Sequence, residues 1–130
     1  MRETFHKSER LCSRTLIQQL LKSGNRFTSG PFRAVWQVRP LAGPSPVQVM
    51  ITVPKSLVPK ATGRNLLKRR IREAYRRNKS FIYPGLTARG MQIALIISYN
   101  TKDSLPFNEI RDKIIVLLRR LNDAVEKTSG

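Results

Sequence analysis

The sequence predicts a single domain of the α+β class, a two-layer sandwich in which a small sheet packs against three helices. Its 130 residues leave room for one compact domain and not for two. Hydrophobic residues make up 40% of the chain, which is enough to build a core. Segments with helical and with strand periodicity follow one another in the order helix, strands, helix, strand, helix. We therefore expect one domain over residues 1–130, with fraying in the first few residues and at about 125–130.

The first predicted element is a short helix at residues 14–23. Ser13 is a suitable N-cap, and Gly24 is a suitable stop after the last helical residue. Apolar side chains recur along one side of this segment, at Leu16, Ile17, Leu20 and Leu21. This spacing is typical of a helix that packs one face on a core. A link rich in Gly and Ser follows.

Two strands are predicted next. Residues 32–38 alternate in a two-residue period, with Phe32 and Trp36 on one face, and residues 47–53 show the same period. The segment between them, residues 40–46, is rich in the Pro and Gly that terminate strands. We expect the two strands to pair as a hairpin.

The second half of the chain contains two helices and one strand. An irregular basic connection at residues 54–63 leads into a helix of about four turns at residues 64–79. Residues 92–99 are apolar nearly throughout, which is typical of a central strand covered on both faces. The last helix is expected to begin near residues 104–106, because apolar side chains then recur at steps of three and four.

The charge of the chain restricts its partners. Lys and Arg number 25 against 8 Asp and Glu, so the net charge is 25 − 8 = +17. Such an excess repels itself, and a polyanion would offset the repulsion and release counterions on binding. No run approaches the roughly 18 apolar residues of a membrane span, and no signal-type block opens the chain. The single Cys12 forms no intramolecular disulfide, which favours a cytoplasmic location.

The basic residues concentrate on the predicted helix after residue 63. Seven of the fourteen residues from 64 to 77 are basic, and only Glu73 is acidic. A helical projection separates an apolar stripe (Leu67, Ile71, Ala74, Tyr75) from a basic stripe (Arg64, Lys68, Arg72, Arg76), with Asn65 and Arg69 on the flank of the latter. Like charges four residues apart weaken a helix, and a solvated face normally mixes signs. The basic stripe therefore favours a nucleic-acid partner over a merely solvated surface.

The sequence offers no set of catalytic residues. Phosphodiester cleavage with two metal ions needs carboxylates that converge on ions about 4 Å apart, and the eight acidic residues are scattered. Metal-free hydrolysis needs an acid/base pair, but His6 is the only histidine, and Cys12 has no evident base beside it. We expect neither a catalytic nor a metal site in the protein itself, which disfavours a self-contained nuclease.

The basic helix resembles the signature helix of the bacterial ribonuclease P protein component. The run Arg64-Asn65-Leu66-Leu67-Lys68-Arg69-Arg70-Ile71-Arg72-Glu73-Ala74-Tyr75-Arg76 has the spacing of the family motif. The opening Phe5-x-Lys7-x-Glu9-Arg10-Leu11 and the segment Val53-Pro54-Lys55 resemble family motifs as well. Two features depart from the family pattern: Leu66 replaces a common arginine, and the loop before the helix is one residue longer.

The resemblance implies both a fold and a function. The implied fold is a mixed sheet of about four strands, with a left-handed crossover around the basic helix. The implied function is that of a non-catalytic subunit that binds the catalytic RNA of ribonuclease P and the 5′ leader of precursor tRNA. In this family the RNA holds Mg²⁺ and cleaves the leader, and neither DNA nor a membrane is a partner. The alternative is a ribosomal or other structural RNA-binding protein.

The resemblance and the charge pattern together predict the site residues. The predicted RNA-binding residues are Arg64, Asn65, Lys68, Arg69, Arg72 and Arg76 on the helix, Lys55 and Lys60 before it, and Lys7 and Arg10 in the opening motif. The family's leader cleft lies between the first helix and the sheet, so its candidate wall residues are Ile17, Leu21, Phe32 and Trp36. For Phe32 and Trp36 a place in the core is the alternative. Ile17 stands where relatives can carry an aromatic residue, so apolar contact rather than stacking is expected there.

Overall fold

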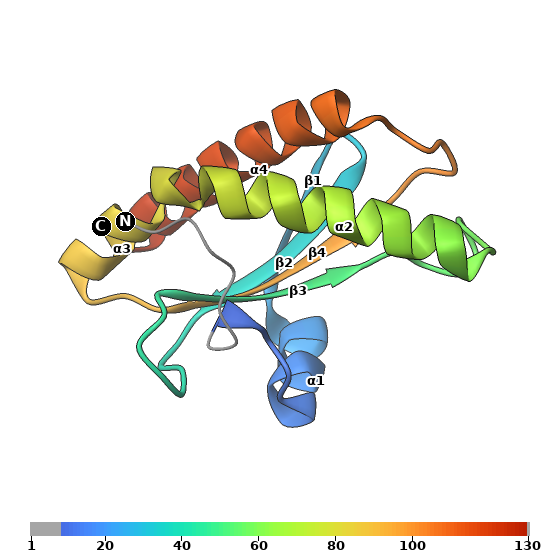
Figure 1. Cartoon of the computed structure of the whole chain (residues 1–130). Coiled ribbons are helices and arrows are strands. Elements are labelled where there is room, and N and C mark those ends of the chain that lie inside the picture. Colours follow the sequence, from blue (N-terminus) through green and yellow to red (C-terminus); the bar gives the residue numbers. More distant parts are fainter. Residues whose placement is uncertain (1–8, 130) are drawn as a thin grey trace.

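A computed structural model describes residues 9–129 of the chain (Figure 1). The described part contains a four-stranded sheet and four α-helices, one more helix than predicted. In chain order the elements are α1 (Arg14–Ser23), β1 (Asn25–Ser29), β2 (Phe32–Val38), β3 (Val47–Thr52), α2 (Ala61–Asn78), the 3₁₀ turn η2 (Lys79–Phe81), α3 (Tyr83–Arg89), β4 (Ile93–Tyr99) and α4 (Phe107–Ser129). The α+β class and the order of the main elements are confirmed.

The strand order of the sheet is β1-β2-β4-β3. β4 pairs antiparallel with β2 and parallel with β3, so that Leu95 lies between Trp36 and Val49. The predicted hairpin between β2 and β3 is therefore wrong. The apolar β4 is buried on both faces and takes the central place, which separates the two strands that follow each other in sequence. The parallel pairing of β3 with β4 requires a crossover connection, and α2 lies in it.

The helices cover the two faces of the sheet unequally. α2 and α4 pack against each other over one face, and α1 lies on the opposite face (Figure 1). The larger core contains Trp36, Ile71, Leu95 and Leu117, whereas a smaller apolar cluster under α1 contains Leu11, Leu20, Val35, Ala94 and Ile96. The predicted two-layer sandwich thus carries α1 as a partial third layer, which leaves part of that face uncovered.

Two elements were not predicted. β1 lies in the segment that we expected to be a link, because its sequence Asn-Arg-Phe-Thr-Ser is short, largely polar and mostly exposed. It forms through antiparallel pairing with β2, which no local signal reveals. α3 has only seven residues and contains Pro84 and Gly85; it ends at Gly90, whose φ of 66° is left-handed.

The position of α1 depends on its two ends. The Ser13 Oγ accepts a hydrogen bond from the Leu16 N–H at 3.3 Å, as expected of an N-cap. At the other end the Gly24 N–H donates to the Leu20 carbonyl at 2.8 Å. A Cβ at position 24 would lie 2.6 Å from that carbonyl oxygen and 2.8 Å from Val35 Cγ1. Gly24 therefore lets the end of α1 approach β2 closely, and this approach forms one side of the cleft described below.

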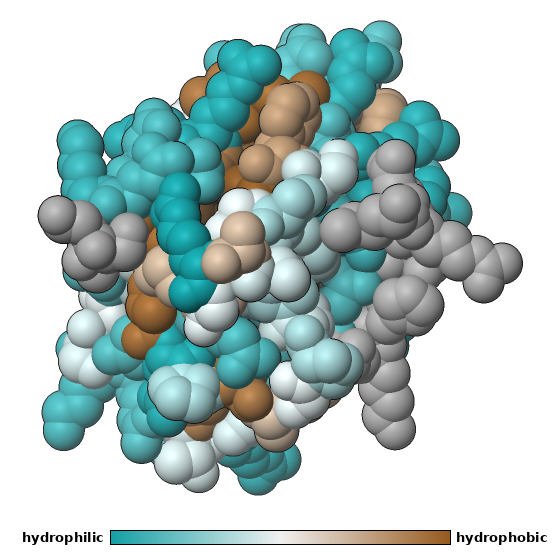
Figure 2. Space-filling view, turned by 90° about the vertical axis from the view of Figure 1, so that its left-hand side faces the viewer, coloured by the Kyte–Doolittle hydropathy of each residue, from teal (hydrophilic) through white to brown (hydrophobic). Residues whose placement is uncertain are grey.

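The face of the molecule at the end where α3 lies is mainly polar (Figure 2). Figure 2, which views the molecule from the end at which α3 lies, shows apolar side chains only in small areas separated by hydrophilic ones. Within residues 9–129, no helix combines the length and apolar character that a bilayer crossing requires.

Candidate nucleic-acid interface

α2 separates its apolar and basic residues as the sequence predicts. Its buried residues are Leu67, Ile71, Ala74 and Tyr75, which confirms the predicted apolar stripe. The first turn of α2 has no side-chain cap and no acidic residue. Its N–H groups and the positive end of the helix dipole are therefore available to an anion. Lys55 and Lys60 are both exposed close to this end of the helix in the chain.

The middle of the basic stripe carries uncompensated charge. Arg69 and Arg72 are exposed and Lys68 is half-buried. Across residues 9–129, none of these three side chains takes part in an ion pair. Asn65 is also exposed, on the flank of the stripe where it was predicted. This part of α2 therefore presents several cations that no carboxylate of the described residues neutralises.

Arg64, at the start of the stripe, organises the loop before the helix. Its Nη1 donates hydrogen bonds to the carbonyl of Val58 at 3.0 Å and to the carbonyl of Pro59 at 2.7 Å. The guanidinium thus holds the end of the loop that contains Lys55 and Lys60 against α2.

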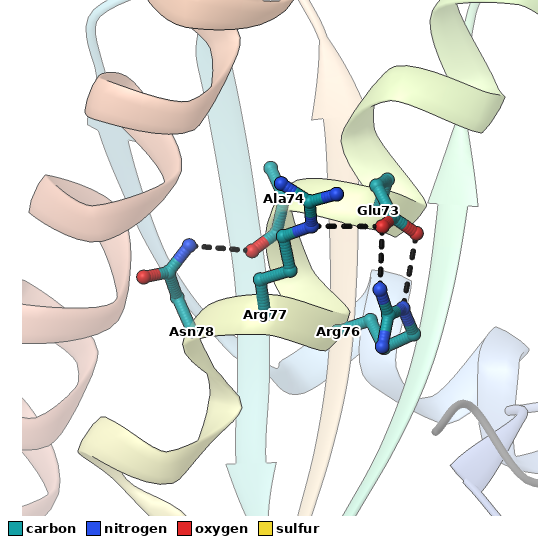
Figure 3. A network of polar contacts seen from close by, with 5 residues as sticks. All are labelled: Glu73, Ala74, Arg76, Arg77 and Asn78. Atoms are coloured by element: carbon teal, nitrogen blue, oxygen red, sulfur yellow. Dashed lines mark hydrogen bonds and ion pairs between the residues drawn. The ribbon is translucent and has the colours of Figure 1, made fainter. Parts of the chain in front are cut away.

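Arg76, at the other end, differs from the prediction of four uncompensated cations. Its guanidinium makes two contacts with Glu73, Nη2 to Oε1 at 2.5 Å and Nε to Oε2 at 3.0 Å, and the Arg77 Nε lies 2.9 Å from Oε1 (Figure 3). Hydrogen bonds from Arg76 and then Arg77 lower the pKa of Glu73 to about 2 against the opposing effect of burial. The carboxylate is one helical turn from Arg76, so it neutralises much of the charge there.

The segment before α1 brings a further predicted residue to the stripe. Arg10 forms a parallel bridge with Val49 on the outer edge of β3, and the Leu11 N–H donates to the Val49 carbonyl at 3.0 Å. Arg10 and Arg72 line the same small groove of about 170 Å³, which we call the edge groove; its other lining residues are Leu11, Cys12, Val49, Met50 and Ile51. Lys7, the other residue predicted in this segment, lies outside the described residues.

A larger cleft of about 550 Å³ lies where α1 leaves the sheet uncovered, and we call it the sheet cleft. The described residues lining it are Leu21, Arg26, Phe27, Thr28, Arg33, Ala34, Val35, Pro54, Ser98, Tyr99 and Asn100. A polar row crosses all four strands here, because Thr28 pairs with Arg33, Arg33 with Ser98, and Ser98 with Thr52. The Thr52 and Ser98 hydroxyls lie 2.8 Å apart. The cleft thus combines hydrogen-bonding groups, a cation and an apolar rim.

For two of the four predicted cleft residues, Phe32 and Trp36, the prediction is wrong, because they do not line the sheet cleft. Phe32 and Trp36 are buried in the larger core, under α2 and α4. The two-residue period of β2 directs them away from α1 and directs Arg33 and Val35 towards it. Leu21 does line the sheet cleft and is 48% exposed, while Ile17 is half-buried against the cluster that includes Val35.

The polar row of the sheet cleft was missed. The one sequence feature that points to this polar row is Arg33, a charged residue on the strand face opposite Phe32. The sequence does not assign Thr28, because its strand is short and largely polar and resembles a link. Ser98 lies in a run that is apolar nearly throughout.

The acidic residues of the described part do not gather into a metal site. In the described part of the chain, no three His, Cys, Asp or Glu side chains gather at one place. Glu9 and Glu73 are each engaged by cationic side chains. The donor set therefore does not fit a pair of catalytic Mg²⁺ ions, which needs converging carboxylates.

The fold and the surface together define a small basic α+β protein with a cationic helix beside an open sheet face. The family described as Ribonuclease P matches residues 5–122. The ribonuclease P protein component of Chlorobaculum tepidum is 33% identical over 117 residues, covering 83% of this chain and 76% of that protein. The protein of the same name from Chlorobium phaeobacteroides is 31% identical over 128 residues, covering 91% and 88%. The chain therefore belongs to the ribonuclease P protein family.

Solved structures agree with this assignment. The ribonuclease P protein of Thermotoga maritima superimposes with a TM-score of 0.68 at 28% identity, covering 86% of this chain and 96% of that one. The protein of Staphylococcus aureus has the same TM-score at 21% identity, covering 88% and 96%, and shows the shared fold. The resemblance stated from the basic helix is confirmed, and the matches favour it over the alternative of a ribosomal protein.

Proposed function

We propose that this chain is the protein subunit of ribonuclease P, which binds the catalytic RNA and the 5′ leader of precursor tRNA and leaves cleavage to the RNA. The observation that carries the proposal is the row of uncompensated cations at Lys68, Arg69 and Arg72 in a chain of this family. Cations held on a rigid helix fit a phosphate backbone, and counterion release on contact supplies much of the affinity.

The basic stripe is the proposed contact with the catalytic RNA. Lys68 and Arg72 would each neutralise a backbone phosphate, while Asn65 can hydrogen-bond to a base or ribose. The uncapped start of α2, with Lys55 and Lys60 near it, supports a further phosphate contact. Arg76 contributes less than the others, because Glu73 holds it.

The sheet cleft is the proposed contact with the single-stranded leader. Arg33 supplies a cation, the Thr28 and Ser98 hydroxyls supply hydrogen bonds, and Leu21 supplies an apolar rim. Of the aromatic residues at the cleft, Tyr99 is buried and Phe27 has the Arg120 guanidinium 4.9 Å from its ring centroid. Hydrogen bonding and apolar contact, rather than stacking on an aromatic platform, are the proposed mode of recognition.

The proposed division of labour assigns the chemistry to the RNA. The RNA and the substrate would hold Mg²⁺, since the acidic side chains of residues 9–129 are dispersed or paired with cations. The protein would raise substrate affinity and lower the Mg²⁺ concentration that cleavage needs. As a subunit of this tRNA-processing endoribonuclease, it would act in the cytoplasm.

Binding to ribonuclease P RNA from the same organism tests the proposal. Lys68→Ala and Arg72→Ala should each weaken the complex and lower the slope of log affinity against log salt by about one. Lys127→Ala, which removes an exposed charge near the end of α4, is the matched control and should change the slope little. Equal affinities and equal slopes for all four proteins would overturn the proposed role of the basic stripe.

A further inference from the structure

A buried polar cluster joins the segment before α1 to the region after α2. The Glu9 carboxylate accepts hydrogen bonds from Lys79 Nζ at 2.8 and 3.0 Å and from the Tyr83 hydroxyl at 2.6 Å. The Tyr83 hydroxyl lies 2.7 Å from that of Tyr75. All four residues, which we call the Glu9 cluster, are at most 4% exposed. They come from the opening segment, α2, η2 and α3.

Stability alone does not account for this arrangement. Removing two opposite charges from water costs about as much as their attraction returns, so apolar side chains of similar size would serve a core equally well. A buried ion pair does, however, restrict the geometry of the segments that carry it, because neither charge can move to a new place without remaining unpaired. The Glu9 cluster therefore fixes where the opening segment lies relative to α2.

The residues after Glu9 show that the Glu9 cluster fixes the position of Arg10. Glu9 is 3% exposed and Leu11 is 4% exposed, whereas Arg10 between them is exposed. The Arg10 side chain therefore faces the surface while its two neighbours face the interior. The bridge of Arg10 to Val49 and the hydrogen bond from the Leu11 N–H hold the same segment along β3. Arg10 is thereby held in the edge groove together with Arg72.

Arg10 and Arg72 are both cationic and both line the edge groove. A phosphate in the groove would attract both side chains, since a guanidinium donates charge-assisted hydrogen bonds to phosphate oxygens. We infer that Glu9, Lys79 and Tyr83 are positioning residues that hold Arg10 beside Arg72, so that the edge groove accepts a phosphate of the RNA backbone. This inference rests on the proposed function.

Glu9→Gln tests the inference, because it keeps the shape of the side chain and removes the charge that Lys79 needs. Two measurements are made on the whole chain: hydrogen exchange of the Leu11 amide and affinity for the ribonuclease P RNA across a salt series. We expect faster exchange at Leu11, about three- to tenfold weaker binding, and a salt slope lower by about one. Arg10→Ala should give the same loss, and the Glu9→Gln/Arg10→Ala double variant should bind no more weakly than Arg10→Ala alone.

A milder variant covers the case in which Glu9→Gln does not fold. Tyr83→Phe removes one hydrogen bond to the carboxylate and leaves the ion pair, so it should give a smaller change in the same direction in both measurements. A variant that loosens Leu11 but binds RNA with unchanged affinity and slope would overturn the inference, as would wild-type binding by Arg10→Ala.

Lys68→Ala distinguishes failure of the positioning inference from failure of the proposed function. If Lys68→Ala weakens binding and the Glu9 and Arg10 variants do not, only the positioning inference is overturned. If the wild-type chain does not bind the RNA at all, the proposed function and the inference are both overturned.

Discussion

Arg33 and Trp36 lie three residues apart on β2 and face opposite sides of the sheet. Trp36 is 4% exposed in the core under α2 and α4, and Arg33 is exposed at the sheet cleft. A single alternating strand therefore supplies a structural residue and a candidate binding residue. The residue types alone leave Trp36 open between the core and the cleft wall, because an aromatic side chain is also the usual stacking platform for a single strand.

Trp36→Ala should destabilise the protein by about 3–5 kcal/mol, since it opens a large cavity in the core. Arg33→Ala should leave the melting temperature nearly unchanged and weaken binding of a leader oligonucleotide. Thermal melting combined with oligonucleotide titration distinguishes the two effects. A Trp36→Ala protein that melts normally and loses leader affinity would mean that Trp36 forms the cleft wall.

At the scale of the element, α2 has two sections that differ in charge. In one section the cations have no carboxylate partner among the described residues, and in the other Glu73 neutralises them. Lys68 and Arg72 have no carboxylate partner among the described residues, whereas Arg76 and Arg77 share Glu73. Glu73 therefore limits how far along the helix a polyanion is attracted.

Glu73→Gln should release Arg76 and raise the salt slope of RNA binding by about one, in the direction opposite to Lys68→Ala. A slope equal to that of the wild type would show that Arg76 lies beyond the reach of the RNA. The affinity and slope are measured with the same RNA and salt series for both variants.

The pKa of Glu73 also predicts an effect of pH on stability. Its folded-state pKa of about 2 is below the usual 4.5, so its ion pairs stabilise the fold above about pH 4.5. This contribution is lost as pH falls towards 2, and it is small because the side chain is 35% exposed. Glu73→Gln should therefore flatten the acid limb of the melting temperature between about pH 4.5 and 2. An acid limb identical to that of the wild type would contradict this assignment.

At the scale of the whole molecule, the net charge of +17 opposes the compact state of the free protein. Salt screens this repulsion over about 10 Å at 0.1 M. The melting temperature of the free chain should therefore rise as sodium chloride increases from about 10 to about 200 mM. A melting temperature that falls over this range would mean that the attractive pairs, such as Arg89 with Glu126, outweigh the repulsion.

The sequence predicted local features better than long-range ones. The buried face of α2 and the central place of β4 follow from the spacing of residues such as Leu67, Ile71 and Leu95, because periodicity is a local property. The pairing of β3 with β4 and of Glu9 with Lys79 joins residues that are far apart in sequence, and no local pattern encodes it. The same limit applies to the candidate site: the basic stripe was predicted from one helix, whereas the polar row of the sheet cleft needs the register of four strands.

Reconstitution of leader removal is the most direct test of the proposed function. Purified chain, ribonuclease P RNA from the same organism and precursor tRNA are combined at a Mg²⁺ concentration at which the RNA alone is slow. We predict that the protein accelerates leader removal in the presence of the RNA and cleaves nothing without it. Leader removal by the protein alone, or a rate with RNA that the protein does not change, would overturn the proposed function.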